Sequence, residues 1–334
     1  MGASKSKVGF GELELIRQIR ARVGTGSGGG VRLGIGDDCA LLRTHPGEEL
    51  AVTTDLSIAG RHFRLDWHPA ESVGHRTLAR GLSDLAAMGA RPVAAFLSLG
   101  LPRELTVPGG RRQAWVDGFL DGLLGLAAAW KTPLAGGDLA ESPVAMADIV
   151  LIGAVARGKA LLRSGARAGD LLYVTGKLGG AAAGLARLGE VGGAGRISRK
   201  HEAELAAHLY PQPRIAQGRW LARHGIASAA IDLSDGLSTD LAHLCDGSGV
   251  AAEVDAELVP VSPGATMEQA LHGGEDYELL FTAAATARVP KRIGGVGISR
   301  IGRIVQARRN RPMVAVMTTQ GRQPMSPQGW EHFA

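Results

Sequence analysis

The sequence predicts an α/β protein of two domains. Its 334 residues exceed one ordinary hydrophobic core and fit two domains of roughly 150 residues each. Apolar residues make up 45% of the chain, so both domains can be packed, whereas aromatic residues make up only 4%. Together with 49 glycines, this composition favours helices packed closely on sheets and many loops where the backbone can approach a ligand.

The first half alternates helical periodicity with short apolar runs. Leu13, Ile16, Ile19 and Val23 recur at helical spacing and predict an N-terminal helix. The segments that follow predict, in order, strands at 31–35 and 49–54, a helix over about 70–89, a buried strand at 92–101, a helix over about 110–130 and a buried strand at 146–158. We place the domain boundary near Lys159, which divides the chain into residues 1–158 and 159–334.

The second half continues the alternation of strands and helices. The pattern predicts a strand at 170–176, helices from 179 and over 215–223, a strand at 229–233, a helix from 237, a turn at 273–278, and strands at 279–284 and 298–305. No fixed-period repeat and no low-complexity linker interrupts this order.

Composition and charge argue against several classes of protein. The net charge is +5, but the arginines are spread along the chain without a basic stripe interleaved with aromatics, so we expect no nucleic-acid partner. Cys39 and Cys245 lack the spacing of a zinc site or a disulfide framework. No apolar run approaches the roughly 20 residues of a membrane helix, and we expect a cytoplasmic protein with no membrane partner.

Acidic residues recur at the ends of apolar, strand-like segments. They are Asp37 and Asp38 in GIGDDCALL, Asp55 in AVTTD, Asp84 in GLSDLAAMG, Asp138 in LAGGD, and Asp232 and Asp235 in AIDLSDGLS. Carboxylates flanked by Gly, Ser or Thr supply the hard oxygen ligands that Mg²⁺ prefers. The chain carries no GxxxxGKS/T loop and no kinase-type HRD and DFG pair. Phosphate must then be held by metal ions, glycine amides, helix N-termini or an arginine.

Each motif taken alone also has a structural interpretation. Asp55 could cap a helix, Asp84 could lie solvated on a helix surface, and GGD is a common turn. Ser234 could N-cap the helix that follows it, besides contacting phosphate. His62 is, by position alone, a turn histidine, and Arg163 a surface residue.

The ordered set of motifs resembles the thiamine-monophosphate kinases, of the superfamily that includes aminoimidazole ribonucleotide synthetase. The resemblance spans nearly the whole chain. It rests on the joint order of GIGDDCALL, TTD with GRHF, LSDLAAMGARP, GGD, LLRSGARAGDLLYVTG, PQPRIAQG, AIDLSDGLSTDL, GGEDYELLFT and GWEHF.

The resemblance implies a set of site residues. The implied Mg²⁺ ligands are Asp38, Thr53, Thr54, Asp55, Asp84, Asp138, Asp232 and Asp235, of which Asp55, Asp138 and Asp235 are the catalytic set. The implied ATP contacts are Gly137, Arg163 and Ser234, and the implied contacts to thiamine monophosphate are His62, Glu275 and Trp330. An aromatic face at Trp330 suits a cationic thiazolium ring. Leu139 to Ser142 depart from the hydroxyl residues that family members often carry after GGD, which weakens a nucleotide contact there.

The resemblance further implies ATP-dependent phosphorylation of thiamine monophosphate by direct in-line transfer with several Mg²⁺ ions. It also implies two α/β domains and a homodimer in which the N-terminal sheets pair. Two alternatives stay open: another ATP-dependent enzyme of the superfamily, such as a selenophosphate synthetase or a hydrogenase-maturation protein, and a noncatalytic Mg²⁺-nucleotide sensor. The first uses a reactive cysteine near a chain end, where neither Cys39 nor Cys245 lies.

Overall fold

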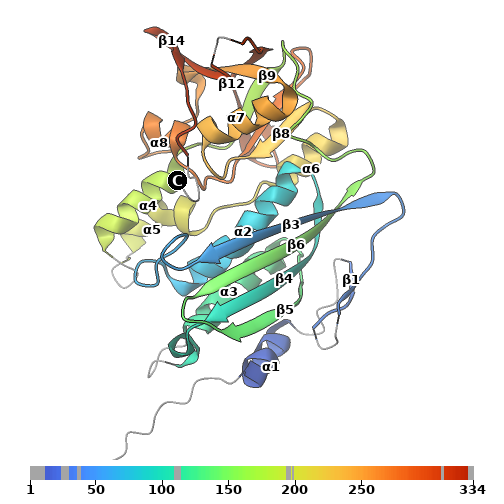
Figure 1. Cartoon of the computed structure of the whole chain (residues 1–334), viewed down its shortest axis with the longest axis vertical. Coiled ribbons are helices and arrows are strands. Elements are labelled where there is room, and N and C mark those ends of the chain that lie inside the picture. The colour runs from blue at the N-terminus through green and yellow to red at the C-terminus, as the bar shows by residue number, and fades with distance from the viewer. Residues whose placement is uncertain are drawn as a thin grey trace, which may run out of the picture.

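The computed structural model describes residues 12–23, 30–35, 39–108, 114–192, 197, 199–309 and 312–329. They form two α/β domains, each built on its own β-sheet (Figure 1). This arrangement confirms the predicted fold class. Within the described part of the chain, no helix has both the length and the apolar character needed to cross a membrane.

The N-terminal domain is built on a four-stranded sheet in the order β3-β6-β4-β5. Only β4 and β5 run parallel, and the other neighbours are antiparallel. The elements of this domain are α1 (Glu12–Val23), β1 (Val31–Leu33), β2 (Leu41–Leu42), β3 (Glu48–Ile58), α2 (Ala70–Ala87), β4 (Arg91–Leu101), the 3₁₀ helix η1 (Arg103–Thr106), α3 (Trp115–Ala129), β5 (Leu134–Glu141) and β6 (Met146–Ala156).

The two faces of this sheet differ. Helices α2 and α3 lie behind the sheet in Figure 1 and bury its apolar side chains, including Leu97, Ile149 and Leu151. The opposite face of β3 carries Leu50 and Val52, which are 54% and 61% exposed. Alternation along the strand explains the difference, because successive side chains point to opposite faces.

The C-terminal domain contains a larger, mostly antiparallel sheet. Its strands follow the order β14-β13-β9-β12-β7-β10-β8, and β11 pairs with β12. Its elements are β7 (Leu171–Thr175), α4 (Gly180–Val191), α5 (Arg199–Leu209), α6 (Ile215–His224), β8 (Ala229–Asp232), α7 (Leu237–Ser248), β9 (Val250–Asp255), the 3₁₀ helix η3 (Ala256–Leu258), α8 (Met267–His272), β10 (Leu279–Ala283), β11 (Arg292–Ile293), β12 (Val296–Gln306), β13 (Val314–Thr318) and β14 (Gly321–Pro324).

Helix α2 joins the two domains. It contacts α3, β3 and β6 of its own domain, and α5, α6 and β8 of the other. Thirteen of its 18 residues are buried, so it is enclosed on nearly every side. It ends where Gly89 adopts a φ of +67°, a left-handed conformation that glycine tolerates without strain.

Most of the long predicted elements are confirmed, but three aspartates do not lie at strand ends as predicted. Asp84 lies inside α2. Asp55 and Asp138 lie inside strands rather than at strand ends, because β3 continues to Ile58 and β5 to Glu141. The GGD turn is in fact part of β5. Gly137 allows this because a Cβ there would come within 1.9 Å of the Leu97 carbonyl oxygen on the neighbouring strand.

The crossing of α2 and α3 gives a test of the packing. A Cβ on Gly122 would come within 1.8 Å of the Glu71 carbonyl oxygen, whereas a Cβ on Gly125 of the same helix would meet nothing within 4 Å. We expect Gly122→Ala to lower the free energy of unfolding by about 1–3 kcal/mol or more through overpacking. Gly125→Ala should be neutral or stabilising by up to about 1 kcal/mol. Urea unfolding of both variants measures this, and equal midpoints would contradict the close crossing.

Candidate active site

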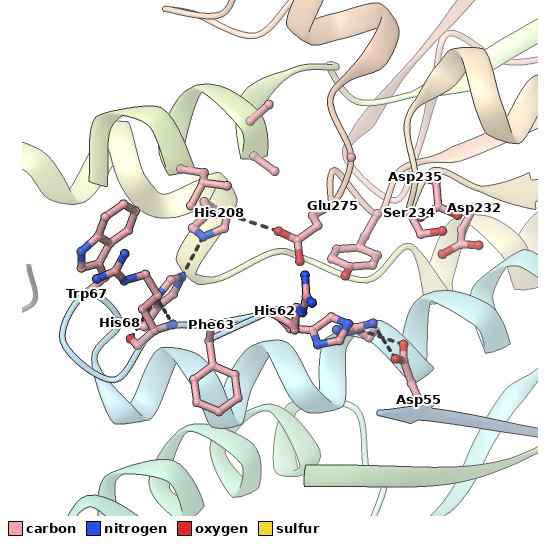
Figure 2. Close-up of a pocket in the computed structure, with 18 of the residues that line it drawn as sticks. Asp55, His62, Phe63, Trp67, His68, His208, Asp232, Ser234, Asp235 and Glu275 are labelled. Carbon is pink, nitrogen blue, oxygen red and sulfur yellow. Dashed lines mark hydrogen bonds and ion pairs between the residues drawn. The ribbon is translucent and has the colours of Figure 1, made fainter. Parts of the chain in front are cut away.

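A cavity of about 490 Å³ lies where the two domains meet (Figure 2). The N-terminal domain contributes β3, the segment 60–68 and α2, and the C-terminal domain contributes α4, α5, the loop after β8 and the turn at 274–277. Seven of the predicted site residues line it: Asp55, His62, Asp84, Asp232, Ser234, Asp235 and Glu275. Residues separated by up to 220 positions in the sequence therefore share one site.

One end of the cavity is acidic. Asp55 of β3, Asp84 of α2, and Asp232 and Asp235 at the end of β8 all line it. Burial raises the pKa of Asp55 and of Asp84. Burial, and next the charge of Asp84, raises the pKa of Asp232 to about 7. Carboxylates crowded in this way favour a bound cation, because a cation stabilises their ionised forms.

Helix α2 fixes the acidic end through hydrogen bonds to both domains. The Ser83 hydroxyl donates to Asp232 Oδ2 at 2.6 Å. The Thr53 hydroxyl donates to Asp84 Oδ2. A strand of one domain and a strand end of the other are thereby attached to consecutive residues of one helix.

Asp55 has a cationic partner that the sequence did not reveal. Arg80 binds it in a two-point ion pair, with Nη2 to Oδ1 at 2.6 Å and Nε to Oδ2 at 2.9 Å. Thr53 and Asp55 lie on the same face of β3, whereas Thr54 lies on the exposed opposite face. The Thr54 side chain consequently does not share the face of Asp55.

The loop that follows β8 is held by a buried aspartate. Asp240 Oδ2 accepts the backbone N–H groups of Asp235 and Gly236, each at 3.0 Å. Burial, followed by the charges of Asp232 and Asp235, raises the pKa of Asp240 to about 8. The predicted N-cap role of Ser234 is wrong, because α7 begins at Leu237 with Gly236 in the capping position and no side-chain cap. Ser234 instead faces the cavity.

The turn at 273–278 carries Glu275 in an unusual backbone conformation. Glu275 and Tyr277 adopt φ values of +69° and +51°, which non-glycine residues rarely do. Backbone hydrogen bonds from Glu275 N to Ser234 O and from Tyr277 N to Leu233 O hold the turn against the β8 loop. Such strain persists where the surrounding structure imposes it, often at functional sites.

Three other predicted residues are described by the structure outside this cavity. Gly137 and Asp138 line a second cavity, of about 460 Å³, between α1, β4 and β5. Arg163 is exposed, and its charge opposes the rise in the pKa of Asp84 and of Asp232. Asp38 and Trp330 fall outside the described residues. The residue before Trp330, Gly329, donates its N–H to the Thr239 hydroxyl at 3.0 Å, beside Asp235.

The donor chemistry of the acidic end fits Mg²⁺, since carboxylate and hydroxyl oxygens are its preferred protein ligands. Among the residues that the structure describes, however, no three acidic, histidine or cysteine side chains form a ready metal-binding group. Support for an ion here rests on the clustered carboxylates and on the raised pKa values of Asp55, Asp84 and Asp232.

Several side chains at the cavity were not predicted from the sequence. They are Arg80, Trp67, His68, His208 and Tyr277, together with Arg76, which does not line the cavity but binds Glu275. Arg76, Arg80, Ser83 and Asp84 follow the i, i+4, i+7, i+8 spacing of one helical face, which is the signal that could have identified them.

Comparisons with known proteins agree with this architecture. The AIR synthase related protein family matches residues 36–160 with its N-terminal domain and residues 167–315 with its C-terminal domain. Thiamine-monophosphate kinase of Salmonella typhimurium is 42% identical over 302 residues, which covers 86% of this chain and 88% of the relative.

Solved structures extend the comparison to three dimensions. Thiamine-monophosphate kinase from Stenotrophomonas maltophilia K279a has a TM-score of 0.74 at 36% identity, over 92% of this chain and 96% of that chain. A structure described as AaThiL complexed with AMPPCP and TMP has a TM-score of 0.75 at 29% identity and covers 100% of both chains. The chain therefore belongs to the thiamine-monophosphate kinase family of AIR synthase related proteins.

Proposed function

We propose that this protein transfers the γ-phosphate of ATP directly to the phosphate of thiamine monophosphate, which yields thiamine diphosphate and ADP. The observation that carries the proposal is the interdomain cavity, which has four carboxylates at one end and Glu275 farther along. The relative solved with AMPPCP and TMP supports the same pair of substrates.

Two phosphate groups that must react repel each other, and the acidic end of the cavity adds further negative charge. Mg²⁺ ions bound between the carboxylates and the phosphates would neutralise the negative charge of both groups. They would also stabilise charge on the transferring phosphoryl group. We propose Asp55, Asp84, Asp232 and Asp235, with Thr53, as residues that hold these ions. Asp38, Thr54 and Asp138 stay predicted ligands.

The remaining roles concern substrate binding. We propose that Ser234, Arg163 and Gly137 contact ATP, and that His62, Glu275 and Trp330 contact thiamine monophosphate. Glu275 suits a cationic substrate because its carboxylate borders the cavity. The phosphate of thiamine monophosphate is already ionised at neutral pH, so positioning and charge stabilisation suffice without a strong general base.

We also propose that the active form is a homodimer. The exposed apolar side chains of β3, Leu50, Val52 and Leu56, form a face that a second sheet could cover. Three inter-strand spacings separate β3 from β5, which is about 14 Å. A single chain therefore keeps Asp138 away from Asp55, and a second protomer could supply an Asp138 to the site.

The domain division at 158/159 and the cytoplasmic location are part of the same proposal. β6 ends at Ala156 and β7 begins at Leu171, which leaves the boundary within the connection between the sheets.

The first prediction is turnover itself. Purified protein with Mg²⁺, ATP and thiamine monophosphate should form thiamine diphosphate and ADP in equal amounts. Chelation by EDTA should abolish both products, and free thiamine should not replace thiamine monophosphate as acceptor. Formation of ADP alone would indicate another acceptor, and absence of both products would indicate a nucleotide sensor.

The second prediction concerns Asp55. Asp55→Asn should lower kcat by at least about 100-fold, because it removes a charge that holds the metal at the transferring phosphate. The amide can still accept a hydrogen bond from Arg80, so the protein should still fold, with a lower thermal midpoint because the Arg80 charge loses its partner. The matched control is Asp246→Asn on the exposed side of α7, which should retain full activity. Near-normal kcat for Asp55→Asn would refute the assigned role.

The third prediction concerns assembly. Light scattering should give twice the 34.6 kDa of one chain. Val52→Glu should shift the protein toward monomers and lower activity with them, because it places a charge in the apolar face. Leu258→Glu, at a 39% exposed leucine of the C-terminal domain, should leave mass and activity unchanged. A monomeric wild-type protein with full activity would exclude the dimer.

A further inference from the structure

The end of the cavity opposite the acidic cluster contains two buried histidines. His68 and His208 are 3% and 2% exposed, and their Nε2 atoms lie 3.0 Å apart. In Figure 2 they lie beside Trp67, with Glu275 between them and the aspartates. Neither histidine takes part in the phosphate chemistry proposed above.

Arg76 determines which nitrogen of His208 carries the proton. Arg76 Nη1 lies 3.1 Å from His208 Nε2, and a guanidinium can only donate hydrogen bonds. His208 Nε2 must therefore be an acceptor. His68 Nε2 lies 3.0 Å from the same atom, and His68 Nδ1 lies 3.1 Å from the backbone nitrogen and 3.2 Å from the carbonyl oxygen of Arg64.

His208 is consequently neutral with its proton on Nδ1. Burial, and next the charge of Arg76, lowers the pKa of His208 well below its ordinary value. Nδ1 is buried and has no hydrogen-bond partner among the described residues. Glu275 Oε2 lies 3.6 Å from Nδ1, which is too long for a hydrogen bond. A buried donor without a partner costs about 1–3 kcal/mol, which a bound acceptor would recover.

Glu275 offers the complementary group. Arg76 Nη2 binds its Oε1, so Oε2 keeps free lone pairs on the side of His208. The N–H of His208 and the carboxylate oxygen of Glu275 thus form an adjacent donor and acceptor on two residues that line the cavity. Trp67, Leu185 and Ala182 supply apolar surface in the same cavity.

We propose that His208 and Glu275 together read the aminopyrimidine ring of thiamine monophosphate, so that His208 is a specificity-determining residue. The His208 Nδ1–H donates to the ring nitrogen next to the amino group, and the Glu275 carboxylate accepts from the amino group itself. Arg76 and His68 act as positioning residues that hold both partners. This inference rests on the proposed function.

The shape of the substrate agrees with this orientation. Thiamine monophosphate carries its phosphate and its aminopyrimidine ring at opposite ends. With the phosphate at the aspartates, the aromatic ring reaches toward the end that holds His208 and Trp67 (Figure 2).

The test compares thiamine monophosphate with oxythiamine monophosphate, in which a carbonyl replaces the amino group and the adjacent ring nitrogen carries a proton. This analogue inverts the donor and acceptor pattern. We expect wild-type kcat/KM to be about 10- to 100-fold lower for the analogue, mainly through KM. In His208→Leu, KM for thiamine monophosphate should rise about 10- to 100-fold, while KM for ATP stays the same. The kcat/KM values for thiamine monophosphate and for the analogue should then differ by no more than about 3-fold.

Two further variants separate specificity from folding. His208→Asn places an amide N–H near the position of Nδ1 and should restore part of the preference. His75→Leu is the matched control, because His75 is a half-buried histidine of α2 that bonds the Pro211 carbonyl at 2.8 Å and does not line the cavity. It should keep the wild-type preference.

The outcomes distinguish the two proposals. Equal wild-type kcat/KM for both substrates, or an unchanged preference in His208→Leu, would overturn the inference and leave the kinase activity intact. If His208→Leu does not fold, the wild-type comparison alone decides. Absence of turnover of thiamine monophosphate by the wild-type protein would instead refute the proposed function.

Discussion

The rest of the site depends on the hydrogen bonds and ion pairs that the polar face of α2 makes with both domains. Arg76, Arg80, Ser83 and Asp84 occupy successive turns of one helical face. They bond three elements: Arg76 the 273–278 turn, Ser83 the end of β8, and both Arg80 and Asp84 strand β3. Charged groups in an enclosed helix are costly unless they are paired. The pairing therefore requires both domains to meet α2 in one arrangement, and this arrangement creates the cavity between them.

The acidic end of the cavity opposes the stability of the unliganded fold. The pKa of Asp232 is raised to about 7, so protonated Asp232 contributes fully to the free energy of unfolding at low pH. This contribution is lost as pH rises from the ordinary carboxyl value through the folded-state value. A bound cation would reverse this effect by favouring the ionised carboxylates. Repulsion among the carboxylates is thus the physical reason why the proposed function assigns metal ions to this end of the cavity.

The two ends of the cavity differ in the hydrogen-bonding groups that they contain. The acidic end contains acceptors in excess and suits phosphates only through cations, whereas the other end presents one donor and one acceptor with aromatic surface nearby. Glu275 connects the two ends of the cavity, because its strained turn is hydrogen-bonded to the β8 loop that carries Ser234. Under the proposed function, binding of the phosphate and binding of the ring would therefore be coupled through one short segment.

The sequence alone determined the fold class, the family resemblance, most long helices and strands, and seven of the residues that meet in the cavity. These follow from local periodicity and from motifs a few residues long, which the chain carries wherever it folds. Strand order and helix orientation were decided only by tertiary packing. For this reason the sequence did not show that Asp55 and Asp138 lie on opposite edges of one sheet, or that GGD continues a strand. His208 became visible only in the structure, because its partners His68, Arg76 and Glu275 lie 67 or more positions away in the chain.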